Sequence, residues 1–115
     1  DKSLEKIENH IKDNSDKRIF IFSYLAYTIK LDLDETLDKY DLINKGNMGS
    51  NENKYIEEID NICKNEDCLF IMDLNEFEPK GAQTSTLLRD YVLENYELCD
   101  SITSVDKVYC KKQEQ

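Results

Sequence analysis

The sequence predicts a small α/β domain, specifically a three-layer, Rossmann-like fold with three to four mainly parallel strands flanked by helices. Short apolar runs, typical of strands buried on both faces, alternate along the chain with amphipathic segments of helical spacing. A length of 115 residues suits one domain, and an apolar share of 39% is too high for a disordered chain. We therefore interpret residues 1–115 as a single domain.

Capping residues and apolar stripes predict the helices. Ser3 and Ser23 each stand where an N-cap is needed, directly before a run with apolar residues at helical spacing. In the last helix the stripe includes Tyr91, Val92 and Tyr96, which predicts that the helix passes Tyr96 and ends at Cys99. The expected helices cover residues 3–14, 24–31, 53–64 and a stretch that begins at Thr84 or Ser85.

The predicted strands are short apolar runs. Residues 68–73 (Cys-Leu-Phe-Ile-Met-Asp) form the clearest one, and residues 18–22 form another. Weaker candidates are residues 40–43 and 105–110. Because helices separate these strands, we expect parallel neighbours joined by right-handed crossovers.

The charge of the chain excludes several classes of partner. The net charge is −10, and residues 31–78 hold 14 acidic against 4 basic residues. Such a surface repels phosphate backbones and anionic headgroups, so we expect no nucleic-acid partner. A cation, a basic protein face or a neutral sugar remains compatible with this charge.

The chain has no run of 18 apolar residues, the length that a membrane-spanning helix needs. Its abrupt start is what an excised piece of a larger protein, or a start chosen for expression, would show.

The four cysteines leave few pairings open. Cys63 and Cys68 flank a predicted helix–strand turn, so a bridge between them and a pair of free thiols are both compatible with the sequence. Cys99 is expected at the edge where strands begin and Cys110 at the opposite edge, a strand length of roughly 17–20 Å away, so a bridge between them is improbable. We therefore expect Cys110 to stay free. A bridge between Cys68 and Cys99 is a weaker alternative, and a loop as short as 63–68 stabilises the fold by less than about 3 kcal/mol.

No motif predicts catalysis or a metal site. The acidic run from Asp32 to Asp38 lacks the Gly and the closing Glu of a calcium loop. Gly46-Asn-Met-Gly49 lacks the Lys-Ser/Thr of a phosphate loop, and Ser23 lacks the glycines of a nucleophile elbow. With one His and no CxxC pair, zinc is disfavoured too. We predict no catalytic residue, no metal and no cofactor.

The candidate binding site lies at the carboxyl edge of the predicted sheet. In open α/β sheets, ligands bind beyond the carboxyl ends of strands. Ser23, Asn47, Asp73 and Asn75 are expected there, and their amide, hydroxyl and carboxylate groups suit a neutral polyol better than an anion. A structural role for each, such as capping by Ser23, is the alternative. We place Cys99 and Ser101 at the opposite edge.

Four stretches resemble a known family: Ala26–Leu31, Tyr40–Gly49, Tyr55–Ile59 and Cys68–Asp73. They are similar to the C-terminal soluble domain of uncharacterised multi-span membrane proteins from low-GC Gram-positive bacteria, which look like glycosyltransferases or polymerases of surface polysaccharide. The resemblance covers about residues 18–109 and rests mainly on Asp-Leu-Ile-Asn-Lys-Gly-Asn-Met-Gly. It implies no catalytic residue in this chain, because the family's chemistry lies in the membrane part.

The resemblance implies that this chain is a non-catalytic extracytoplasmic domain on the outer face of the cell membrane. Its partners would be the membrane-embedded part of the same polypeptide, which it would stabilise, and a glycan or lipid-linked substrate, which it would position. The alternative is a free-standing intracellular α/β enzyme or regulatory protein.

Overall fold

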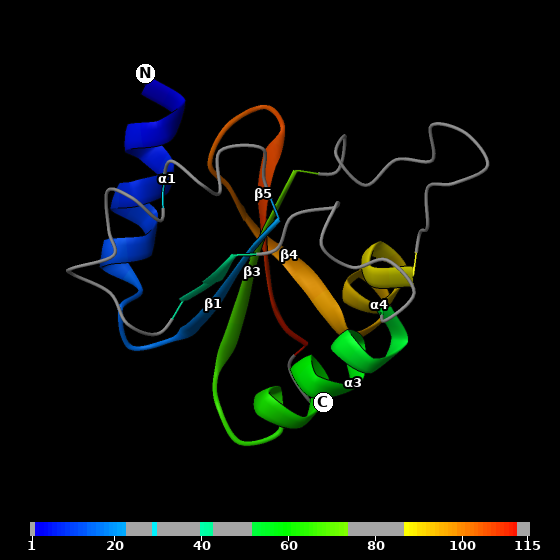
Figure 1. The fold of residues 1–115 in the computed structure, drawn as a ribbon. Helices are drawn as coiled ribbons and strands as arrows, with labels where there is room; N and C mark the ends of the chain where they lie inside the picture. Colours follow the sequence, from blue (N-terminus) through cyan, green and yellow to red (C-terminus); the bar gives the residue numbers. More distant parts are fainter. Residues whose placement is uncertain (1, 23–28, 30–39, 43–51, 74–86, 113–115) are drawn as a thin grey trace.

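Three helices and five strands make up the part of the chain that the computed structural model describes, which is residues 2–22, 29, 40–42, 52–73 and 87–112. Figure 1 shows the sheet between α1 on one side and α3 and α4 on the other. The elements in chain order are α1 (Lys2–Asp13), β1 (Arg18–Phe22), β2 (Tyr40–Leu42), α3 (Glu52–Cys63), β3 (Cys68–Asp73), α4 (Leu87–Asn95), β4 (Tyr96–Ser101) and β5 (Asp106–Lys111).

The sheet is mixed, with the strand order β2-β1-β3-β5-β4. β1 pairs in parallel with β2 on one side and with β3 on the other. β5 pairs antiparallel with both β3 and β4. The prediction of a small α/β domain is therefore confirmed, but the prediction of a mainly parallel sheet is wrong, because two of the four pairings are antiparallel.

The difference arises at residues 96–101. We expected the last helix to end at Cys99 and the chain to turn over residues 101–104, but α4 ends at Asn95 and β4 begins at once. Only a short turn, residues 102–105, joins β4 to β5. Two strands joined by so short a turn have to run antiparallel, because a parallel pair needs a crossover of a dozen residues or more.

One face of the sheet carries aliphatic side chains that α1 covers. Alternate residues of the three central strands point to this face, since successive side chains of a strand point to opposite sides. The Ile7–Ile11 stripe of α1 packs against them, as its helical spacing predicted. Ile29, the one described residue of the helix predicted over 24–31, is buried here. The buried cluster comprises Ile7, Ile11, Ile19, Ile21, Ile29, Leu69, Ile71 and Val108.

The opposite face carries the aromatic core beneath α3 and α4. Phe70 lies at its centre, with ring centroids 5.2 Å from Phe20, 5.8 Å from Phe22 and 4.5 Å from Tyr96. Tilted and offset rings at such distances add to the hydrophobic stabilisation. The remaining buried members are Ile59, Cys63, Cys68, Met72, Leu88, Val92 and Tyr109.

Candidate functional site

The structure describes one of the four predicted site residues. Ser23, Asn47 and Asn75 lie outside the described residues, so their expected meeting stays a prediction. Asp73 is the last residue of β3 and is 3% exposed. It therefore lies at the carboxyl edge of the sheet, but within the fold rather than on the surface.

A second buried carboxylate lies directly opposite. In the β3–β5 register Asp73 faces Asp106, which is 1% exposed. Directly opposed residues of an antiparallel pair have Cβ atoms about 5 Å apart, and alternation places both on the α1 side of the sheet. No local pattern in the sequence indicates that these two residues meet, because their pairing depends on the antiparallel direction of β5.

Hydrogen bonds tie Asp106 into the β4–β5 turn. Thr103 Oγ1 donates to Asp106 Oδ2 over 2.7 Å and accepts hydrogen bonds from the backbone N–H groups of Val105 and Asp106. Lys107 Nζ donates to Ser101 Oγ over 2.7 Å and to the Thr103 carbonyl over 3.2 Å. This network closes the turn, so part of the hydrogen-bonding capacity of Asp106 serves the fold.

The turn corrects the expected position of Ser101. We placed Ser101 at the opposite edge from Asp73, but β4 runs in the same direction as β3, and Ser101 pairs with Lys107 next to the Asp73–Asp106 pair. The carboxyl edge therefore gains the hydroxyl groups of Ser101 and Thr103, which sequence reasoning missed. The run Ser-Ile-Thr-Ser, typical of a turn, was the available signal.

This edge has the donors and acceptors that bind hydroxyl groups. The hydroxyl groups of Ser101 and Thr103 are the accessible hydrogen-bonding groups, and Lys107 supplies a cation beside them. In the strand order, the strand that follows β1 in the chain, β2, lies at one edge of the sheet, whereas β4 and β5, the strands that follow β3, lie toward the opposite edge. Ligand crevices of α/β sheets form at such points of divergence, and here that point lies between β1 and β3, beside the strand that ends at Asp73. Within the described ranges, no group of three or more His, Cys, Asp or Glu residues is placed to hold a metal ion.

Comparison of the chain with protein-family models, curated proteins and solved structures gives no significant match. The resemblance to the soluble domain of multi-span membrane proteins therefore stays an expectation. None of the helices in the described ranges is long and apolar enough to cross a membrane.

The first disulfide joins Cys63, the last residue of α3, to Cys68, the first residue of β3. Their Cα atoms are 5.6 Å apart, and both residues are buried in the aromatic core. Of the two readings that the sequence left open, the structure has the bridge rather than the free thiols. The bridge fixes the turn at the amino edge of the sheet, away from Asp73.

The second disulfide joins Cys99 to Cys110, with Cα atoms 5.8 Å apart. We expected this bridge to be improbable and Cys110 to stay free, and both expectations are wrong. Cys99 belongs to a strand rather than to the end of a helix, and that strand lies beside β5. The distance argument failed because it assumed a parallel last strand.

A tyrosine–carboxylate cluster connects α4 to α3. Tyr91 Oη donates to Asp60 Oδ1 over 2.9 Å, and the Tyr91 and Tyr96 rings are 6.2 Å apart. Burial, and then the hydrogen bond to Asp60, raise the pKa of Tyr91 well above its ordinary value. Burial also raises the pKa of Tyr96, although its hydrogen bond with Tyr91 acts in the opposite direction. Both phenols are therefore neutral at physiological pH, which suits packing rather than acid–base chemistry.

Proposed function

We propose that this chain is an extracytoplasmic domain that positions a hydroxyl-rich ligand, a glycan or lipid-linked sugar, beside a membrane-embedded part of the same polypeptide. The two disulfides are the observation that carries the location, because such bonds persist in oxidising compartments and are rare in the cytosol. They also weigh against the alternative of an intracellular enzyme or regulatory protein.

The polar carboxyl edge supports the ligand class. Asp73 and Asp106 meet there, and Ser101 and Thr103 add hydroxyl groups. The exposed Ser101 hydroxyl and the half-buried Thr103 hydroxyl can exchange hydrogen bonds with a neutral sugar, whereas the net charge of −10 repels a free phosphate. The ligand role is one of binding and orientation, since we assign no nucleophile or general base to this edge.

The location is tested by trapping the thiol state in the producing cells. Free thiols are blocked with N-ethylmaleimide at lysis, and the cysteine peptides are then mapped by mass spectrometry. We expect no label before reduction and four labelled cysteines after it. Label on all four cysteines before reduction would overturn the extracytoplasmic location.

Sequencing the complete gene tests whether the polypeptide has a membrane-embedded part. We expect about ten hydrophobic spans upstream of Asp1. A start codon directly before Asp1 would contradict the membrane-embedded part.

The ligand is tested by titrating neutral oligosaccharides of hexoses and N-acetylhexosamines into ¹⁵N-labelled protein. We expect chemical-shift changes at Asp73, Ser101, Thr103 and Asp106. The substitution Ser101→Ala, at an exposed hydroxyl of this edge, should weaken the changes, and Asp16→Asn, an exposed change in the α1–β1 turn at the opposite edge, should leave them intact. Changes centred on Cys63 and Cys68 would reject this edge as the site.

A further inference from the structure

The two disulfides lie in contrasting surroundings. Cys63 is 5% exposed and Cys68 is 2% exposed, and both pack in the aromatic core. Cys99 is exposed and Cys110 is half-buried at the margin of the α1-side core. Thiol–disulfide exchange requires a thiolate to reach a sulfur atom along the S–S axis, so access governs its rate. The second disulfide is therefore the accessible one.

Cys99 also occupies an irregular position in the ladder. Leu98 pairs with Tyr109, but Asp100 pairs with Val108, so the β4–β5 register shifts by one residue and leaves Cys99 as the unpaired residue of a β-bulge. A bulge interrupts the backbone hydrogen bonds locally. The ladder is thus weakest at the residue that carries the disulfide.

β4 is held mainly by its one neighbour. It is an edge strand of the described sheet, and of its six residues only Tyr96 is buried. Leu98, its one other large apolar side chain, is 59% exposed. An element with few buried contacts opens locally at a lower free energy than the core strands do. The Cys99–Cys110 bond therefore adds a covalent tie to the backbone pairing that holds this strand to β5.

We propose that Cys99–Cys110 is a thiol-exchange site that a dithiol reductant opens while Cys63–Cys68 stays intact, so that its reduction releases the β4 edge. A thiolate of the reductant attacks the Sγ atom of Cys99, and the Cys99–Cys110 bond breaks. Cys110 leaves as a thiolate and takes up a proton. The second thiol of the reductant, as its thiolate, then attacks the reductant sulfur that is bonded to Cys99. This closes the reductant's own disulfide and releases Cys99, which takes up a proton and becomes a thiol. Two electrons pass from the dithiol, which ends as a disulfide.

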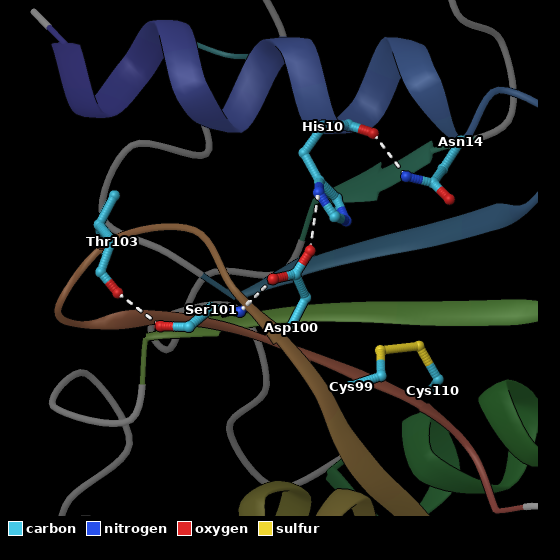
Figure 2. Close-up of polar contacts among 7 residues, drawn as sticks. All are labelled: His10, Asn14, Cys99, Asp100, Ser101, Thr103 and Cys110. Carbon is cyan, nitrogen blue, oxygen red and sulfur yellow. Dashed lines mark hydrogen bonds and ion pairs between the residues drawn. A yellow bond between two sulfur atoms is a disulfide. The ribbon is translucent and has the colours of Figure 1, made fainter.

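A reporter of this release lies one residue away. Figure 2 shows His10 of α1 above Asp100, the residue that follows Cys99. His10 Nδ1 is 3.9 Å from Asp100 Oδ2, and Asp100 Oδ1 accepts a hydrogen bond from the Ser101 N–H over 2.7 Å. His10 is the only histidine of the chain. Its imidazole proton resonances therefore report on a single place, the contact between α1 and the β4 edge.

The first test measures which disulfide is reduced. The folded protein is exposed to dithiothreitol without denaturant, samples are quenched with iodoacetamide, and the four cysteine peptides are quantified. We expect Cys99 and Cys110 to be alkylated at least about tenfold faster than Cys63 and Cys68, because the buried pair requires a larger opening. Equal rates, or faster alkylation of Cys63 and Cys68, would overturn the proposal.

The second test measures whether β4 is released. We expect the His10 imidazole resonances to shift when Cys99–Cys110 is reduced and to return on reoxidation, while amide exchange accelerates in β4 and not in β3. Asp100→Asn in the oxidised protein should shift the imidazole resonances without accelerating amide exchange. Selective reduction of Cys99–Cys110 with unchanged His10 resonances and unchanged amide exchange in β4 would show that the bond is accessible but that its reduction does not release β4. That outcome would reject the proposal. Apart from the Asp100→Asn control, both measurements use the unmodified protein, so their outcome does not depend on a variant that folds.

Discussion

Glu52 illustrates how a buried carboxylate serves the fold. It is the first residue of α3, yet its Oε1 accepts a hydrogen bond over 3.2 Å from the backbone N–H of Leu88, the second residue of α4. The first N–H groups of a helix have no partner within the helix, and the helix dipole favours an anion there. One side chain of α3 therefore caps the neighbouring helix.

The cap predicts a graded pair of substitutions. Glu52→Ala should lower the free energy of unfolding by about 1–2 kcal/mol, because it leaves a buried N–H without an acceptor. Glu52→Gln should cost less, since its amide oxygen still accepts. Urea unfolding followed by circular dichroism gives both values. Glu57→Ala, an exposed change on the same helix, is the matched control, and equal losses for all three variants would refute the cap.

The tyrosine cluster predicts a loss of stability in alkali. Tyr91 and Tyr96 have raised pKa values when folded, whereas tyrosines of the unfolded chain ionise near pH 10. Above about pH 10 the unfolded state releases protons that the folded state retains. The stabilisation is therefore complete below pH 10 and decreases as the pH rises toward the folded-state values.

Urea unfolding between pH 8 and pH 11.5 measures this decrease. Tyr91→Phe removes one of the two phenols, so the stability of this variant should fall less steeply above pH 10. Tyr55→Phe, which alters a partly buried tyrosine of α3, serves as the comparison. An unchanged slope in Tyr91→Phe would show that this phenol does not cause the alkaline loss.

At the scale of elements, α1 depends on a narrow apolar stripe. Ile7 and Ile11 are fully buried against the sheet, and Leu4 is partly buried beside them. Because most helical stability in proteins comes from the packing of one face, α1 should be held by these few side chains rather than by helix propensity. Its docking in turn covers the aliphatic face of β1 and β3.

Ile11→Ala tests that dependence. It removes buried methyl and methylene groups and leaves a cavity, so we expect a loss of about 2–5 kcal/mol in the free energy of unfolding. Lys12→Ala, the next and exposed position, should change it by less than about 0.5 kcal/mol. Thermal and urea unfolding provide the values. A loss below 1 kcal/mol for Ile11→Ala would mean that α1 contributes little to the folded state.

At the scale of the whole molecule, charge opposes compaction. A net charge of −10 on 115 residues produces repulsion that the fold has to overcome. Local pairs relieve some of it, such as Lys17 Nζ with Asp67 Oδ2 at 3.0 Å, an exposed bridge between the starts of β1 and β3. The hydrogen bond and charge of Asp67 raise the pKa of Lys17. Exposed pairs of this kind contribute little, so most of the repulsion remains.

Salt should therefore stabilise this protein. Added salt shortens the screening length from about 10 Å at 0.1 M to about 3 Å at 1 M, which weakens long-range repulsion more than short contacts. We expect the melting temperature to rise between 0.05 and 0.5 M sodium chloride. Scanning calorimetry measures it, and a parallel series at pH 4.5, near the isoelectric point, should show a smaller rise. A melting temperature that falls with salt at pH 7 would contradict net repulsion.

The local pattern determined the elements that have a strong periodic signal. The apolar runs became β1 and β3, and helices 3–14 and 53–64 match α1 and α3 within a residue at each end. The short run at Tyr40 became β2. In these segments the burial pattern and the element type coincide, because a strand buried on both faces needs a continuous apolar run and a surface helix needs a stripe.

Tertiary structure alone decided the end of the chain. Only the first of β4's six residues is buried, so β4 carries almost no hydrophobic signal, and Tyr96 continued the stripe of α4. What makes residues 96–101 a strand is backbone pairing with β5 and the bond from Cys99 to Cys110. Neither contact leaves a local trace in the sequence. The direction of β5, the meeting of Asp73 with Asp106 and the exposed disulfide all follow from that pairing, because a strand's partner is chosen by distant residues.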